Sequence, residues 1–165
     1  MSIFSAVFGR SNGTWAGGEV DLSEAESIDD ITDLMRDVAG AEDPDAAEGT
    51  MVLLMEADDE WFGVVRVDDR ADPRVFLSDA RAVHSNAVAA LLLDSGTIHE
   101  PEMVEGTGQK PYPDPGGDTG LLADLGTAPA DLIALTLGEG LLPADALAVL
   151  AERAGFADSL DALRV

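Results

Sequence analysis

The sequence predicts an α+β fold in which a mostly antiparallel sheet of about five strands is followed by short helices. Three observations support this prediction. Apolar, β-prone runs of strand length occupy residues 51–56 and 61–67, and a shorter run follows at 74–77. Another pair of strand-like runs stands at the start of the chain. Segments with apolar residues at helical spacing follow each group of strands, so the expected order is ββαβββα and then a helical tail.

The first two strands are expected at residues 2–8 and 15–22. Between them, Asn12-Gly13 is a strong signal for a tight hairpin turn, because both residues tolerate a positive φ. Two glycines weaken the second of these strands. The chain is therefore predicted to begin with a hairpin.

A helix is predicted to begin at Ser27, three residues before Asp30, in an arrangement similar to a capping box. Gly40 is expected just past its C-terminal end. The apolar residues at helical spacing are Ile28, Ile31, Leu34, Met35 and Val38. One aspartate per turn is expected on the solvent side, at Asp29, Asp33 and Asp37.

The central runs at 51–56 and 61–67 are apolar on both of their alternating faces. A strand of this kind is normally covered on both faces, so helices of the same chain or a partner protein must lie over each side of the sheet. Residues 57–60 between the two runs are expected to form a hairpin loop. After the third run, Ser78 or Asp79 is expected to cap a helix that extends to about residue 93.

The remainder of the chain divides by composition. Residues 94–118 are rich in proline and glycine and are expected to form a linker or an extended strap. We therefore expect a sheet domain over 1–93, this linker, and a small helical segment over 119–165 that packs on the sheet or forms a bundle. In that segment, Pro129 and Pro143 each suit the first turn of a helix, and the second of these helices is expected to end at Gly155.

Charge is the most unusual property of the sequence. The 165 residues contain 33 acids and 9 bases, a net charge of −24. Clustered lysine and arginine are what phosphate backbones require, so direct nucleic-acid binding is not expected, and an anionic membrane would repel the chain. No apolar run reaches the roughly 18 residues of a membrane span, and no secretory signal is apparent, so we expect a cytoplasmic protein. The charge favours either solubility or a basic partner.

The sequence contains no recognisable catalytic or metal-binding pattern. It has no cysteine, which excludes disulfides, thiolate metal sites and cysteine nucleophiles. Nucleotide-binding glycine motifs and the Gly-x-Ser-x-Gly elbow are also missing. Of the two histidines, His84 is interpreted as structural or surface, and His99 lies in the linker without a rigid set of supporting ligands. We therefore expect no enzyme activity, no cofactor and no metal.

The candidate contact residues lie at the central hairpin. Asp58, Asp59 and Glu60 form an acidic loop beside Trp61, and tryptophan and arginine are enriched at binding hot spots. Together with Arg74, these residues are the predicted partner-binding site. The alternative interpretation is that Trp61 is a core residue at the start of a strand. A Trp61→Ala change that weakens binding more than stability would support the contact role.

The chain contains the runs DEWFGVVRV at residues 59–67 and DPRVFLSDA at 72–80. Both runs resemble the bacterial tRNA adenosine deaminase-associated protein family. The tail is similar too, in the segments GD at 117–118, LLADLG at 121–126, LLP at 141–143 and AERAGF at 151–156. The resemblance covers nearly the whole chain and implies association with the deaminase, not deaminase activity. A zinc deaminase needs two cysteine ligands, and this chain has none.

Four hypotheses follow. The first is a non-catalytic accessory protein that binds a basic partner, which the resemblance suggests is a tRNA adenosine deaminase. The second is an acidic nucleic-acid mimic that competes with RNA for a basic protein surface. The third is an enzyme with an unrecognised carboxylate site. The fourth is a soluble domain whose charge serves only solubility.

Overall fold

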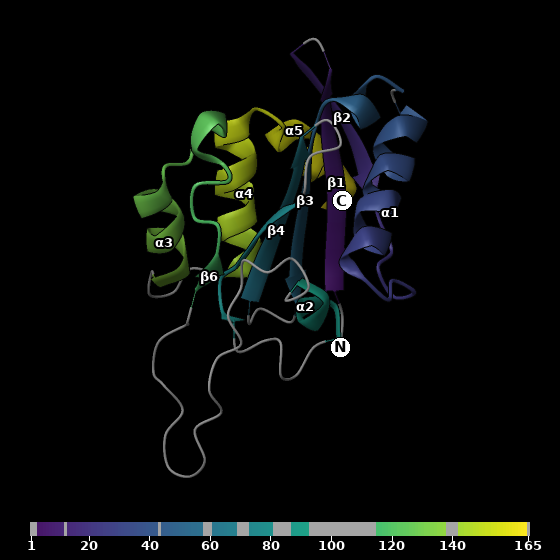
Figure 1. The fold of residues 1–165 in the computed structure, drawn as a ribbon. Coiled ribbons are helices and arrows are strands. Elements are labelled where there is room, and N and C mark those ends of the chain that lie inside the picture. The colour runs from purple at the N-terminus through teal and green to yellow at the C-terminus, as the bar shows by residue number, and fades with distance from the viewer. Residues whose placement is uncertain are drawn as a thin grey trace.

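A six-stranded antiparallel sheet lies between two layers of helices in the computed structural model (Figure 1). The strand order is β2-β1-β3-β4-β5-β6. The strands are β1 (Ile3–Ser11), β2 (Thr14–Glu19), β3 (Thr50–Ala57), β4 (Trp61–Asp68), β5 (Arg74–Leu77) and β6 (Gly116–Gly117). The structure describes residues 3–11, 13–42, 44–57, 61–68, 73–80, 87–92, 115–137 and 142–164.

The predicted fold class is confirmed, and the sheet has one more strand than expected. The extra strand, β6, pairs with β5 through residues that were predicted to belong to the 94–118 linker. At Gly117 φ is +110°, and a Cβ there would lie 2.3 Å from the carbonyl oxygen of Val75. Only glycine can approach β5 this closely. The glycines at 116–117, which led to the prediction of a linker, therefore allow this segment to form the edge strand of the sheet. Residues 94–114 lie outside the described part of the chain.

The predicted N-terminal hairpin is confirmed. Ser11 pairs with Thr14, which leaves a two-residue loop in which Gly13 has φ of +78°. β2 ends at Glu19, three residues earlier than predicted. The reason is that the chain leaves the sheet after Val20, whose N–H makes a last bond of 2.9 Å to the carbonyl oxygen of Ser5. Leu22 is then buried on the way to the first helix.

β3 and β4 are buried on both faces, and helices of the same chain cover each face. Met51, Leu53 and Met55 lie in one core cluster, whereas Val52 and Leu54 lie in the other. This alternation is the predicted one. The sequence left open whether helices of the same chain or a partner protein cover the sheet. In the structure, helices of the same chain cover both faces.

Helix α1 (Ile28–Glu42) covers the first face. Ser27 Oγ accepts the N–H of Asp30 at 3.2 Å, and the Asp30 carboxylate accepts the N–H of Glu26 at 2.9 Å. The predicted cap is thus present, with its reciprocal bond shifted by one residue. The prediction that the helix stops before Gly40 is wrong: α1 continues to Glu42, and Gly40 does not have the positive φ of a glycine that ends a helix.

Short helix α2 (Ala87–Leu91) contributes Val88 and Ala89 to the same core. Of the predicted helix over 79–93, the structure describes only residues 79–80 and 87–92, since residues 81–86 and 93, with His84, lie outside the described residues. The cap predicted at Ser78 or Asp79 stays a prediction, because residues 81–86 lie outside the described residues. The buried Oγ of Ser78 accepts the N–H of Phe62 at 2.8 Å, and the Ser78 N–H donates to the Phe62 carbonyl oxygen at 2.9 Å, which extends the β4–β5 pairing by one residue.

The C-terminal helices cover the second face. They are α3 (Pro129–Leu137), α4 (Pro143–Ala154) and α5 (Ala157–Arg164), preceded by a 3-10 turn, η4 (Ala123–Leu125). Leu147 and Leu150 of α4 pack with Phe76 and the even-numbered side of β3. Both prolines stand at first helical positions and α4 ends at Gly155, as predicted.

Candidate interaction surface

The predicted contact residues separate into three groups. Asp58, Asp59 and Glu60 lie outside the described residues. Trp61, the first residue of β4, is 3% exposed and belongs to the core cluster on the α1 side of the sheet. This burial matches the alternative interpretation of Trp61 as a core residue. Its contact with a partner stays a prediction.

Arg74 is half-buried on β5, and its guanidinium is already engaged. Its Nε donates to Oδ2 of Asp118 at 2.6 Å. Asp118 also accepts the N–H of Gly120 at 2.9 Å, so it holds the chain after β6 against β5. Arg74 therefore connects the sheet to the C-terminal segment, and its contact with a partner stays a prediction.

Arg66 is the cross-strand neighbour of Arg74 and the least exposed charged residue of the described chain, at 4%. Its Nε donates to Asp68 at 3.1 Å, and its Nη1 donates to the carbonyl oxygen of Leu121 at 2.7 Å. Arg66 also forms a bidentate ion pair with Asp124, in which Nη1 donates to Oδ1 and Nη2 donates to Oδ2 at 2.9 Å. We call Arg66, Asp68, Asp118, Asp124 and Arg74 the arginine clamp.

The sequence indicates that Arg66 needs a partner, but it does not identify that partner. A single charged residue inside a strand that is buried on both faces requires a partner, because an unpaired buried charge is strongly unfavourable. Arg66 stands in such a strand. The partner, Asp124, is 58 residues away, and no local pattern identifies it.

The clamp changes the acidity of its members in a consistent direction. Hydrogen bonding to Arg66 holds the pKa of Asp124 below its ordinary value, and hydrogen bonding to Arg74 does the same for the pKa of Asp118. The pKa of Arg66 is raised, chiefly by its hydrogen bond to Asp124. All three groups therefore stay charged at neutral pH, and the clamp is an ion-pair network.

An Asp124→Asn variant tests the contribution of this network to acid stability. A carboxyl whose folded-state pKa is lowered stabilises the fold above its unfolded pKa of about 3.9, and this stabilisation disappears as pH falls through the folded-state pKa. The wild-type chain should therefore be more stable than the variant at pH 7, by a margin that is constant to about pH 5 and shrinks below about pH 4. Urea unfolding from pH 7 to pH 3 measures this margin.

The control for that experiment is Asp131→Asn, which removes the acid of an exposed pair with Arg153. At pH 7 this change should alter the free energy of unfolding by no more than about 0.5 kcal/mol. A margin for Asp124→Asn that stays constant down to pH 3 would show that Asp124 does not act through its ionised form.

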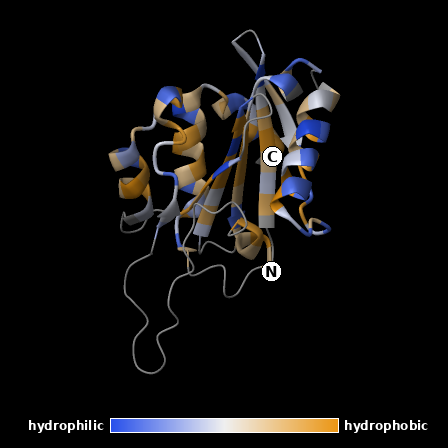
Figure 2. Ribbon diagram, in the orientation of Figure 1, coloured by the Kyte–Doolittle hydropathy of each residue, from blue (hydrophilic) through white to orange (hydrophobic). Residues whose placement is uncertain are grey.

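Six exposed acids lie in the segment that leads from β2 into α1 and along α1 itself. We call them the acidic strip, and they are Asp21, Glu24, Glu26, Asp29, Asp33 and Asp37. The only base within residues 21–37 is Arg36, which lies 3.5 Å from Asp33. Blue, hydrophilic stretches alternate with white and orange ones along α1 in Figure 2, while the strands beside it are orange and white. The exposure predicted for Asp29, Asp33 and Asp37 is confirmed.

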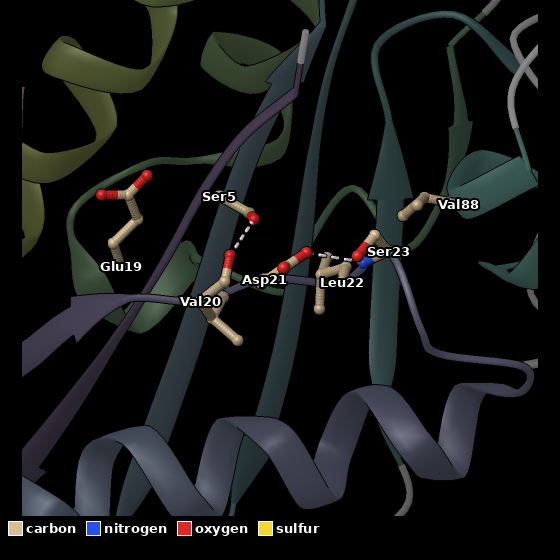
Figure 3. A pocket seen from close by; sticks show the side chains of 7 residues that line it. All are labelled: Ser5, Glu19, Val20, Asp21, Leu22, Ser23 and Val88. Atoms are coloured by element: carbon tan, nitrogen blue, oxygen red, sulfur yellow. Dashed lines mark hydrogen bonds between the residues drawn. The ribbon is translucent and has the colours of Figure 1, made fainter.

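A pocket of about 550 Å³ opens where β2 ends and the chain turns toward α1 (Figure 3). Its lining includes Ser5, Asp21, Ser23 and Val88. Ser5 Oγ donates to the carbonyl oxygen of Val20 at 2.6 Å, and the N–H of Ser23 donates to Oδ1 of Asp21 at 2.9 Å. The Ser23 bond lowers the pKa of Asp21, so its carboxylate is ionised, and the pocket suits a cationic group.

Among the residues that the structure describes, no group of three or more histidine, aspartate or glutamate side chains is arranged to hold a metal ion. Within the same residues, no helix combines the length and the apolar character needed to cross a membrane. His99 lies outside the described part of the chain.

Comparison with known proteins gives two matches. A family model described as Rv3753c-like tRNA adenosine deaminase-associated protein matches residues 3–157. The chain is 31% identical to Protein Rv3753c of Mycobacterium tuberculosis over 162 residues, an alignment that spans 97% of this chain and 86% of that protein. No solved structure matches this chain.

Proposed function

Because this chain belongs to the Rv3753c-like tRNA adenosine deaminase-associated protein family, we propose that it is a cytoplasmic, non-catalytic accessory protein that binds a basic protein partner, the tRNA adenosine deaminase. The observation that carries the proposal is the acidic strip, considered together with the family description. Six exposed carboxylates within residues 21–37 give a surface whose charge complements a basic protein.

The remaining features fit an adaptor better than an enzyme. The arginine clamp uses its charged groups to hold the C-terminal segment on the sheet. Asp21 and Ser23 of the pocket are engaged with each other. Long-range attraction between an acidic strip and a basic partner raises the association rate and fixes orientation, which is what an accessory subunit requires.

A second candidate function rests on the spacing of Asp29, Asp33 and Asp37. They stand one per turn of α1, on its exposed side, as a regular row of negative charge. Such a row could occupy the phosphate-binding surface of the deaminase, and the protein would then act as an acidic mimic that competes with RNA. Competition with tRNA separates this candidate from the first.

The test is size-exclusion co-elution of the purified chain with the tRNA adenosine deaminase of its own organism, at low and at near-physiological salt, with and without tRNA. A complex that persists at physiological salt and in the presence of tRNA is the expected result. Displacement by tRNA would favour the mimic. If no complex forms at either salt concentration, the proposed function is wrong.

Charge variants locate the surface. Changing Asp29, Asp33 and Asp37 together to asparagine should weaken the complex about tenfold, since each exposed charge pair contributes about 0.2–1 kcal/mol. A control with the same change in net charge is the combination Asp145→Asn, Glu152→Gln and Asp158→Asn, at exposed positions of α4 and α5. Equal weakening by both triple variants would mean that net charge alone, and not the strip, attracts the partner.

A further inference from the structure

The outer edge of β2 offers unused backbone hydrogen-bonding groups. β2 is the terminal strand of the sheet, and the last bond of its pairing with β1 joins the Val20 N–H to the Ser5 carbonyl oxygen. Residues that exchange bonds with β1 alternate with residues that do not. By this alternation the N–H and C=O groups of Trp15, Gly17 and Glu19 point away from β1.

Nothing in the described chain occupies this edge. No backbone hydrogen bond from another described element reaches Trp15, Gly17 or Glu19. Helix α1 lies over one face of β2, where a Cβ at Gly18 would be 3.4 Å from Val38, and α5 lies over the other face. The faces of β2 are thus covered, while its edge pairs with no other strand among the residues that the structure describes.

The edge also has no feature that would prevent another strand from pairing with it. Proteins usually protect an edge strand with proline, lysine or a bulge. β2 has the sequence TWAGGE, and its register with β1 is continuous from Ser11↔Thr14 to Ala6↔Glu19. At the other side of the sheet, β6 has only two residues. Of the two edge strands, β2, with six residues, is therefore the one long enough to pair with an added strand.

The charge around this edge determines what could bind there. Glu19 is exposed at the end of β2, and Asp21 lines the pocket that follows it (Figure 3). The acidic strip continues from there onto α1, which packs against β2. A second copy of the chain would bring another net charge of −24 to this surface, whereas a basic segment would be attracted to it.

We propose that the outer edge of β2 is a docking site at which an extended, arginine- or lysine-rich segment of the partner adds to the sheet as a further strand. Main-chain bonds to Trp15, Gly17 and Glu19 supply affinity, and the pocket beside Asp21 takes a basic side chain of the added strand. The identity of the partner rests on the proposed function, but the existence of the site does not.

A probe peptide tests the site without the deaminase. The probe is a capped hexapeptide of alternating arginine and valine, added to the isotopically labelled full chain, and amide exchange is followed by NMR. The amides of Trp15, Gly17 and Glu19 should become protected about tenfold, while Ala16 and Gly18, which already bond to β1, should not change. A peptide of alternating glutamate and valine is the control.

Two results of this experiment would overturn the proposal. One is that the basic peptide protects none of the three edge amides. The other is that the acidic peptide protects them equally, which would show that charge does not select the occupant. Shifts confined to α1 would count as the first result, because they indicate attraction to the acidic strip without strand addition.

Two variants of Glu19 test whether the deaminase itself binds at this edge. Glu19→Pro removes an outward N–H to which no other element of the described residues makes a backbone bond, and proline is tolerated on an edge. Glu19→Gln removes the charge and keeps the N–H. If the deaminase binds, Glu19→Pro should weaken its binding at least about tenfold and Glu19→Gln by less.

The peptide experiment and the Glu19 variants distinguish the proposed function, which is deaminase binding, from strand addition at β2. Deaminase binding that is unaffected by Glu19→Pro, in a variant with the wild-type melting temperature, contradicts strand addition and leaves the proposed function intact. If the deaminase does not bind at all, the proposed function fails, and the peptide experiment still decides whether the β2 edge accepts a basic strand. The peptide experiment uses the wild-type chain, so it also decides the matter if Glu19→Pro does not fold.

Discussion

Replacing Arg66 with methionine is expected to lower the free energy of unfolding by about 2–4 kcal/mol. Methionine retains an unbranched stem of similar length, so packing on the sheet changes little. The variant loses the bonds to Asp68 and Asp124 and leaves the carbonyl oxygen of Leu121 without its donor. Urea unfolding at pH 7 measures the loss.

The expected loss is below the roughly 3–5 kcal/mol typical of breaking a fully buried pair. Arg66 is buried, but the side chain of Asp124 is 60% exposed, so water can solvate the acid that remains. Arg153→Met is the matched control, because Arg153 pairs with Asp131 at the surface. That variant should change stability by no more than about 0.5 kcal/mol, and an equally small change for Arg66→Met would contradict the clamp.

Replacing Trp61 with alanine is expected to lower the free energy of unfolding by about 3–5 kcal/mol. The physical reason is the cavity left when an indole that is 3% exposed is removed from the core cluster on the α1 side of the sheet. Thermal and urea unfolding measure the loss. Trp61→Phe, which keeps an aromatic ring in the same place, should lose clearly less.

The same variants test the contact role predicted for Trp61. Binding to the deaminase is measured at a temperature where each variant is folded. Weakening that follows the stability loss and is relieved by Trp61→Phe would identify Trp61 as a core residue alone. Weaker binding by a fully folded Trp61→Ala chain would instead support a contact, as the sequence suggested from its acidic neighbours.

Local patterns predicted most of the elements correctly. Strand periodicity at 51–56 and 61–67 gave both the strands and the face on which each residue lies, because neighbouring side chains of a strand point in opposite directions. Asn12-Gly13 gave the hairpin, and Ser27 gave the start of α1. These signals depend on residues within a few positions of one another.

The candidate surface was less predictable. The sequence drew attention to Asp58, Asp59 and Glu60 because they adjoin a tryptophan, and they lie outside the described residues. It predicted the exposed aspartates of α1 from helical spacing but gave no reason to prefer them as contacts. The role of Arg74 in holding Asp118 was not apparent, because the two residues are 44 positions apart.

Composition and periodicity were enough to establish the α+β class, the two-sided burial of β3 and β4, and the acidic character of the chain. The folded structure alone determined that α3, α4 and α5 cover the second face, that β6 joins the sheet, and that Arg66 meets Asp124. Secondary-structure preferences arise from neighbouring residues, whereas these pairings depend on which distant surfaces bury apolar area and satisfy charge together. The position of β2 at the edge of the sheet is also a feature that only the folded structure determines, since an edge is defined by the strands that lie beside it.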